Sequence, residues 1–555
     1  DLSIVHGNHS FKTGVDYVWE PTLGGYFEFN PTLTLGWFDD PSIIASNSNG
    51  KYPQGFATPG ALQSMALAGG NPAFEFSAKM LGGYFQDDWK IRHNLTLNLG
   101  LRYDKDFGLY GENVIPQSRT YLELKAINSP YASSIPDPDS KDFSPRVGFA
   151  YSFGSSGRQV IRGGYGIYYG QTFINIPLFM VQQANPVLFA TLFSISHGGV
   201  GAACSNCTVP GTSIPLASYR WGVDPVPVAP PPPTSLPAGA TGRLVDPNFR
   251  NPMSQQFNLG YSIQVSNSSV IEVDLVHELA NHEPKTVNIN PQTCATCARI
   301  LASAFTNAGQ PALGSISNNE AISNSQYNGG NVSYRRRMSH NIAFTSTYTL
   351  SWARSYRGSA ASFGNTATDP FAPLRAVDFG YVPNDERHRW VNSATVNLPW
   401  GFQIAPIMQL ASARPYNITE GISDVLGFGS GNGASDAIVL NSAPNNFTAT
   451  AGYTATQLRA CLAAATCHEL PFDFARGQGF FQLDSRVTKN IKLGENKELG
   501  LIFQGFDLTN RANFGNTFQG NIRSSIFGRP TGYITPAGVI VPKSFRAEFG
   551  ARFAF

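Results

Sequence analysis

The chain has 555 residues and a formal net charge of +2, and only 14% of its residues are charged, against about 25% in an ordinary soluble domain. Such a small net charge, without basic clusters interleaved with aromatic side chains, argues against a nucleic-acid partner. No apolar run of about 20 residues occurs, and the mean hydropathy is −0.15, which argues against membrane-spanning helices. The abundance of glycine (55), phenylalanine (39) and tyrosine (22) favours a membrane or other aromatic-rich β protein.

The first predicted elements are strand pairs joined by short polar turns. Residues 1–5 and 10–19 flank a turn at Gly7-Asn8-His9. The clearest pair comprises residues 81–91, a turn at 92–94, and residues 95–104. In its second arm every second residue from Leu95 to Tyr103 is apolar, and the residues between them are polar or glycine. This period of two is the pattern of a strand with one face in lipid and the other in water.

Five further pairs repeat the pattern along the chain, and a last strand runs to Phe555. In this last strand the phenylalanines at 545, 549 and 553 share one face, while arginine and glutamate side chains occupy the other. The predicted pairs are residues 143–153 with 159–170, 255–265 with 270–279, 327–338 with 342–353, 388–398 with 402–413, and 480–493 with 499–508.

Long connections rich in Gly, Pro, Asn and Ser alternate strictly with these short turns. They cover about 21–72, 107–142, 172–253, 280–324, 355–384, 414–477 and 509–540. Short turns on one side and long loops on the other are typical of an outer-membrane β-barrel, with the loops extracellular and the turns periplasmic. The sequence therefore predicts an all-β fold, a transmembrane antiparallel up-and-down β-barrel located in the bacterial outer membrane.

The alternative is a soluble β-sandwich, propeller or β-helix. Sandwich strands are about 5–6 residues long, shorter than the predicted ones, and the 40–50-residue period of a propeller is not found. About 15 strands can be counted, whereas single-chain bacterial barrels close with an even number. We therefore expect residues 1–555 to be one barrel domain that is incomplete at its N-terminal side, from a parent of about 22 strands.

The six cysteines form three local pairs, Cys204/Cys207, Cys294/Cys297 and Cys461/Cys467. Two of the pairs have the CxxC spacing of zinc sites, but each pair lies in a different long loop. In an exported protein, local disulfides that pin these loops are the favoured interpretation.

Catalytic and cofactor motifs are weak. The histidines of His277-Glu278 and His282-Glu283 are five residues apart, whereas the zinc motif HExxH needs four on one helical face. Residues 163–170 are glycine-rich but lack the spacing and following helix of a phosphate-binding loop. No nucleophile, base and orienting group can be assembled from linear spacing, so we expect no enzyme activity, no metal site and no cofactor.

Several segments together resemble one known family. Residues 83–90 (GYFQDDWK) and 95–104 (LTLNLGLRYD) resemble the mid-barrel hairpin of TonB-dependent outer-membrane receptors, and the resemblance is greatest to the Oar-like subgroup. Further segments agree in family order across nearly the whole chain, namely residues 143–151, 161–169, 385–391, 483–489 and 506–514. The resemblance implies a plug domain and a TonB-contacting segment, which we expect to belong to a missing N-terminal region together with a regulatory-like domain.

The resemblance also suggests the partners and roles of particular residues. Phe555 resembles the C-terminal signal read by the outer-membrane assembly machinery. Besides that machinery and the membrane lipid, the TonB complex and an unidentified extracellular ligand are the implied partners. Charged residues on the inner face are expected to pair with one another or with a plug, and only secondarily to contact a solute, because an unpaired charge in a narrow cavity is costly. These lumen-facing candidates are Arg102, Asp104, Glu272, Asp274, Asp484, Arg486, Arg546, Glu548 and Arg552.

Two functions remain open, while a third, a passive porin, is disfavoured by the family resemblance and by the estimated strand count. In the first, the barrel is part of a TonB-dependent transporter that takes up a ligand too large for diffusion pores. In the second, it is a surface-interaction protein whose disulfide-pinned loops serve adhesion or the export of a partner. The loop residues match no ligand site that would identify the ligand.

Overall fold

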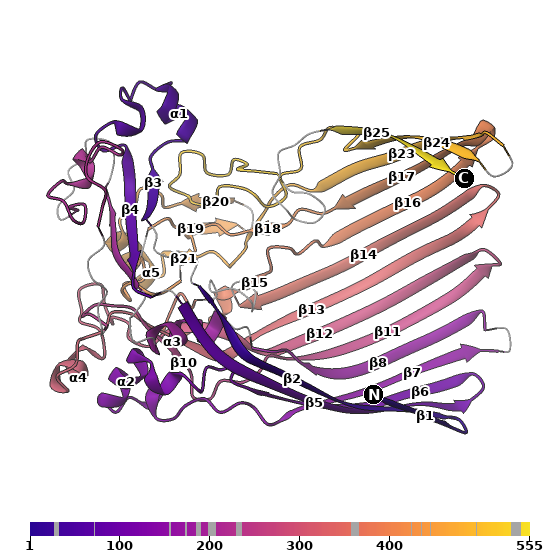
Figure 1. Ribbon diagram of the computed structural model, residues 1–555, viewed down its shortest axis with the longest axis horizontal. Helices are drawn as coiled ribbons and strands as arrows, with labels where there is room; N and C mark the ends of the chain where they lie inside the picture. The colour runs from indigo at the N-terminus through magenta and orange to yellow at the C-terminus, as the bar shows by residue number, and fades with distance from the viewer. Residues whose placement is uncertain are drawn as a thin grey trace.

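The computed structural model describes residues 1–26, 33–71, 73–154, 157–172, 175–184, 190–197, 207–228, 236–356, 366–422, 424–433, 436–443, 446–494, 497–533 and 545–555. One antiparallel sheet dominates the structure, and its long strands run side by side with short turns at one end (Figure 1). None of the helices in the described ranges is long and apolar enough to cross a membrane.

Fifteen strands follow one another as antiparallel neighbours in chain order, which confirms the predicted up-and-down arrangement. The strands β1 and β25 stand at the two ends of this order, where the pairings of the described residues join them only to β2 and β24. The fifteen strands are β1 (Leu2–His6), β2 (His9–Tyr26), β5 (Ala73–Arg92), β6 (Leu95–Phe107), β7 (Asp142–Phe153), β8 (Gln159–Tyr169), β11 (Met253–Ser266), β12 (Ser269–Asn288), β13 (Ile316–Ser339), β14 (Ile342–Tyr356), β16 (His388–Leu398), β17 (Phe402–Ala411), β23 (Phe480–Lys492), β24 (Glu498–Phe506) and β25 (Arg546–Ala554).

Two short strands join the same sheet within connections that were predicted as loops. β10 (Gly242–Val245) pairs in parallel with β13, and β15 (Phe379–Tyr381) pairs with the end of β14. With these two the sheet has 17 strands. Strands of four and three residues are too short to show a period of two, so the sequence pattern does not reveal them.

The two faces of the sheet differ in chemistry as the alternation predicts. Leu259 and Leu275 lie directly opposite each other on β11 and β12, and both are about half exposed. The row continues across the sheet through Val332 and reaches Phe549 on β25, whose side chain is 83% exposed. Large apolar side chains exposed in such rows mark the lipid-facing side of the barrel, and the opposite face is the inner one.

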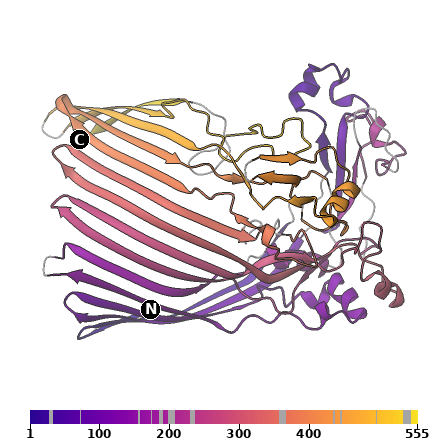
Figure 2. The same ribbon diagram turned by 180° about the vertical axis from the view of Figure 1, so that it is seen from behind.

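The end of the barrel away from the turns carries a layer of folded loops, which is on the left in Figure 1 and on the right in the view from behind in Figure 2. It contains small sheets and short helices where flexible connections were expected. The small sheets comprise β3 (Leu33–Trp37), β4 (Leu62–Gly69) and β9 (Ala190–Ser196), then β19 (Ile438–Ala443), β20 (Asn446–Ala449) and β21 (Cys467–Glu469), and the pair β18 (Pro415–Tyr416) and β22 (Ala475–Arg476). The α-helices are α1 (Pro41–Ser46), α2 (Arg119–Ala126), α3 (Asn175–Ala184), α4 (Ala302–Asn307) and α5 (Ala455–Ala463).

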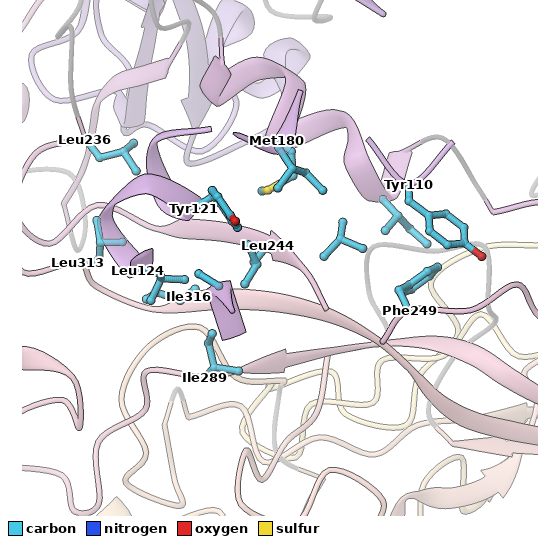
Figure 3. Packing of buried hydrophobic residues seen from close by; sticks show 14 of the residues in the cluster. Tyr110, Tyr121, Leu124, Met180, Leu236, Leu244, Phe249, Ile289, Leu313 and Ile316 are labelled. Atoms are coloured by element: carbon cyan, nitrogen blue, oxygen red, sulfur yellow. The ribbon is translucent and has the colours of Figure 1, made fainter. Parts of the chain in front are cut away.

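The fully buried apolar side chains lie mainly in this loop layer. The largest cluster joins the connections β6–β7, β8–β11 and β12–β13, and includes Tyr110, Leu124 and Met180 (Figure 3). Phe305 belongs to the same cluster. Met180 and Phe305 have no exposed surface. Burying these side chains supplies the hydrophobic stabilisation that orders the loops, so the extracellular layer has hydrophobic cores of its own.

Candidate functional site

The inner face of the barrel carries the candidate site, because ion-paired side chains from several strands gather there. Arg102 on β6 donates to Asp104 through Nε and Nη2, with Nη2 at 2.7 Å from Oδ1. Its Nη1 donates to Asp16 on β2 at 3.2 Å, across the intervening strand β5. Gly82 of β5 lies under this group, and a Cβ there would collide with the Arg102 guanidinium. A glycine therefore permits the ion pair to cross a strand.

A second group of charges spans β8, β12 and β13. Arg162 lies 2.8 Å from Asp274 and 3.8 Å from Glu272, and Arg335 lies 3.2 Å from the other oxygen of Glu272. Gly260 of β11 again occupies the crossing point, since a Cβ there would meet both Arg162 and Asp274. Arg162 and Arg335 were not among the predicted inner-face residues, although they supply the positive charges of this group.

The third group belongs to β23, β24 and β25. Asp484 accepts hydrogen bonds from Gln482 at 2.9 Å and from the backbone of Asp507 at 2.8 Å. Arg486 donates to Gln504, whose amide nitrogen donates in turn to Glu548 at 3.3 Å.

At the last strand Glu548 also pairs with Arg546 at 3.2 Å, and both side chains are largely exposed. Arg552 lies on the same face of β25, two residues beyond Gly550, and the ion pairs among the described residues do not include it. Phe555 is 93% exposed beside Phe553, and its role in assembly stays a prediction.

Two hollows open on this inner wall beside the predicted charges. One of about 430 Å³ is lined by Thr345, Ser393, Asp484, Arg486 and Gln504 among others. Another of about 280 Å³ is lined by Arg102, Asp104, Asp106, Asp142 and Asn251 among others. Both combine carboxylates with guanidinium groups, so the wall can hold polar or charged groups of either sign by hydrogen bonds and ion pairs.

The smaller hollow also contains the buried polar residues Asp106, Asp142 and Asn251, which were not predicted. Asn251 donates to Asp142 at 2.7 Å and to Asp106 at 3.4 Å, and these carboxylates are almost fully buried. Asn251 is more than a hundred residues from either aspartate. No local spacing connects residues this far apart. Alternation along β6 and β7 could have placed Asp106 and Asp142 on the inner face, but Asn251 precedes β11 and carries no such signal.

The loop layer contains buried ionisable groups. Glu123 on α2 is 7% exposed, and its Oε2 has no hydrogen-bond partner. Burial raises the pKa of the Glu123 carboxyl to about 7, and the nearby Arg119 charge opposes this rise. A carboxyl with this pKa changes its charge around neutral pH, whereas an ordinary glutamate is already ionised there.

The cysteines stabilise the same layer. Disulfides join Cys294 to Cys297 and Cys461 to Cys467, the second tying α5 to β21. Cys207 is disulfide-bonded as well, whereas Cys204 lies outside the described residues. The bridges Cys294–Cys297 and Cys461–Cys467 each close a loop of a few residues, so they constrain local turns more than the overall fold.

Of the residues that superficially resemble a zinc motif, His277 and Glu278 lie on a strand, as expected. His282 and Glu283 were expected in a loop, but they lie on the same strand, because β12 continues to Asn288. The His277 ring hydrogen-bonds the Asn328 side chain at 2.7 Å on the outer face. Glu278 accepts from Ser254 on the inner face, and Glu283 accepts from Ser325. The described residues contain no group of three or more His, Cys, Asp or Glu side chains arranged to hold a metal ion.

Comparisons with known proteins agree with this architecture. The family model described as an outer membrane beta barrel domain matches residues 1–540. The fold is similar to the outer membrane transporter YddB from Escherichia coli, with a TM-score of 0.50, 10% identity, and coverage of 100% of this chain and 52% of that chain. A search of curated proteins finds no significant match.

Weaker likeness extends to two other structures. The ferric enterobactin receptor PfeA from Pseudomonas aeruginosa has a TM-score of 0.42 and 8% identity, covering 98% of this chain and 54% of that chain. The FrpB iron transporter from Neisseria meningitidis has a TM-score of 0.43 and 9% identity, covering 100% of this chain and 53% of that chain. The chain thus spans about half the length of these structures. By its family match and its strand arrangement, the chain belongs to the outer membrane β-barrel domain family.

Proposed function

We propose that this barrel belongs to a TonB-dependent outer-membrane transporter that takes up a large ligand, and that its closest relationship is to the Oar-like subgroup. The observation that carries the proposal is the polar inner wall, where charges of both signs line hollows beneath a folded extracellular layer. A barrel that served only as an anchor would need neither the hollows nor so many lumenal charges.

The motif series across the chain supports the TonB-dependent reading, as does the likeness in fold to an outer membrane transporter. Within this proposal residues 1–555 form one barrel domain, and a plug and a TonB-contacting segment belong to the whole protein. The inner-face charges then serve first as partners for the plug and second as contacts for the ligand. Arg102, Asp104, Asp484 and Arg486 are the best placed for the second role, because they line the hollows.

The test compares three strains of the native host under limiting nutrients. One lacks this protein, one lacks TonB, and one carries the protein without residues 450–466, which include α5. If the protein is a TonB-dependent transporter, loss of TonB reproduces the growth defect caused by loss of the protein.

The alternative function is adhesion or assisted export by the loops, with the barrel as anchor, and the folded loop layer is the observation that favours it. Under this alternative, adhesion or export by the protein is retained in the strain that lacks TonB and is lost in the loop variant. Immunodetection of the barrel in outer-membrane fractions checks that each strain still assembles the protein.

A further inference from the structure

Three arginines surround one tyrosine at the loop-side end of β14. The guanidinium carbon of Arg354 lies 4.5 Å from the centre of the Tyr381 ring, and its Nη2 donates to the Tyr381 hydroxyl at 2.9 Å. Arg476 lies 4.6 Å from the same ring. Arg387 lies 5.2 Å from it and 5.7 Å from the ring of Trp352. Cation–π contacts of this kind hold guanidinium groups in a defined place.

The cluster lies on the lipid-facing side of the sheet. Tyr381 pairs directly with Arg354, so their side chains share one face. Arg354 continues the row of Tyr348, Leu350 and Trp352, alternate residues of β14 that are each more than a third exposed. Trp and Tyr side chains gather at membrane interfaces. The arginines therefore stand just beyond the outer aromatic girdle, at the level of the extracellular lipid headgroups.

The positive charge of the cluster is only partly neutralised. Arg476 pairs with the buried Asp385 at 3.0 Å. Arg354 and Arg387 form no ion pair with any of the residues that the structure describes, and the Nε of Arg387 is buried without a hydrogen-bond partner. Two half-buried guanidinium groups are thus held against aromatic rings without a counter-charge among the described residues, an arrangement that favours the binding of an anion.

The carboxylate of Glu386, the residue before Arg387, is already engaged. Glu386 receives Arg389 at 2.6 Å and Arg414 at 2.8 Å, one on each oxygen. Arg389 pairs in register with Ala411 on the inner face of β16 and β17. Glu386 is therefore directed to the lumen side and does not balance the outward cluster.

We propose that Arg354 and Arg387 bind a phosphate group of an anionic lipid in the outer leaflet of the membrane. The planar guanidinium fork matches the geometry of phosphate oxygens. The apolar and aromatic row below the cluster gives the acyl chains of the same lipid a surface to lie on, which a free anion in solution would not use. This lipid-binding site lies on the outer face of the sheet, so it does not depend on which ligand passes through the lumen.

The test uses the full-length protein purified in a neutral detergent and measures lipid binding by native mass spectrometry. The probes are lipid A with two phosphates, the same lipid without phosphates, and inorganic phosphate. The variant combines Arg354→Gln with Arg387→Gln. The control is Arg335→Gln, which removes an exposed arginine from the inner face.

The native protein and the control are expected to bind bisphosphorylated lipid A alike, and the double variant at least about tenfold more weakly, since a charge-assisted bond to phosphate contributes about one such factor. The dephosphorylated lipid should bind the native protein as weakly as the phosphorylated lipid binds the variant. Equal binding by the double variant, equal binding of the dephosphorylated lipid, or displacement of the lipid by millimolar inorganic phosphate overturns the proposal.

Folding of each variant is checked by its heat-dependent shift on SDS gels. If the double variant does not fold, Arg387→Gln alone carries the test, because it leaves Arg354 and Arg476 around Tyr381. This single variant is expected to bind bisphosphorylated lipid A about tenfold more weakly than the native protein, and unchanged binding overturns the proposal.

Discussion

Replacing Leu275 by lysine tests which face of the sheet meets lipid. Leu275 is 53% exposed on the outer face of β12, six residues after Ser269, where the strand begins. At about 3.3 Å per residue and a tilt of about 45°, it stands about 14 Å above the turn, near the middle of a lipid-facing band about 25 Å tall.

A lysine at this depth costs about 2–4 kcal/mol, which is roughly a 30- to 700-fold loss in the folding equilibrium constant. The matched control is Val276→Lys, one residue further along the same strand. Val276 lies on the inner face between Asn258 and Gly329, where water can reach the new charge. We expect the control to cost less than about 1 kcal/mol.

The measurement is urea-induced unfolding of the protein folded into phosphatidylcholine vesicles, followed by tryptophan fluorescence. The decisive quantity is the difference in the free energy of unfolding between the two variants, because both substitutions lie on the same strand at nearly the same depth in the membrane. A loss for Val276→Lys that equals or exceeds the loss for Leu275→Lys would refute the assignment of the faces.

Three other changes have defined outcomes. Glu272→Gln should lower the free energy of unfolding by less than about 1 kcal/mol, because its partners Arg162 and Arg335 are 45% and 62% exposed; a larger loss in the same urea assay would show a coupled network. Glu123→Gln should abolish the pH dependence of the stability of the loop layer. The raised pKa means that the folded state binds a proton more tightly, so stability falls as the pH rises from about 4.5 to about 7, by at most about 3 kcal/mol. Faster hydrogen exchange of α2 at pH 8 than at pH 5 in the native protein, but not in the variant, would confirm this, and equal exchange at both pH values would contradict it. Phe305→Ala should cost about 3–5 kcal/mol of loop stability because the ring is fully buried; limited proteolysis should then cut the loops while the barrel keeps its heat-dependent gel shift, and uncut loops would count against the packing argument.

The strand pairs near the turns could be predicted from sequence because their pattern is local. The turn expected at residues 339–341 is formed by His340 and Asn341, both with positive φ, a conformation that a two-residue hairpin needs. The far ends of the strands could not be predicted in this way. β12 was expected to end at Leu279, where the alternation stops, yet it continues to Asn288. Beyond the bilayer, pairing with β13 sustains the strand without an apolar face.

The candidate site was predictable only in part for a related reason. Alternation assigns a residue to a face, and on this basis Arg102 and Asp104 could be placed together. It does not provide the register between strands, which brings Arg102 to Asp16, 86 residues earlier. The role of Gly82 in that contact follows from the same register. Neither could be read from the order of residues along one strand.

The shared hydrophobic cluster of the loop layer has a mechanical consequence. Three connections, β6–β7, β8–β11 and β12–β13, contribute to one packed core, so a pull on any of them is distributed to the other two. The cluster can close only after the six strands that flank and separate these connections, β6, β7, β8, β11, β12 and β13, are aligned, so this part of the loop layer assembles after them. Shortening one connection would expose apolar side chains of the other two connections to water. A change in the length of one connection therefore requires matching changes in the other two.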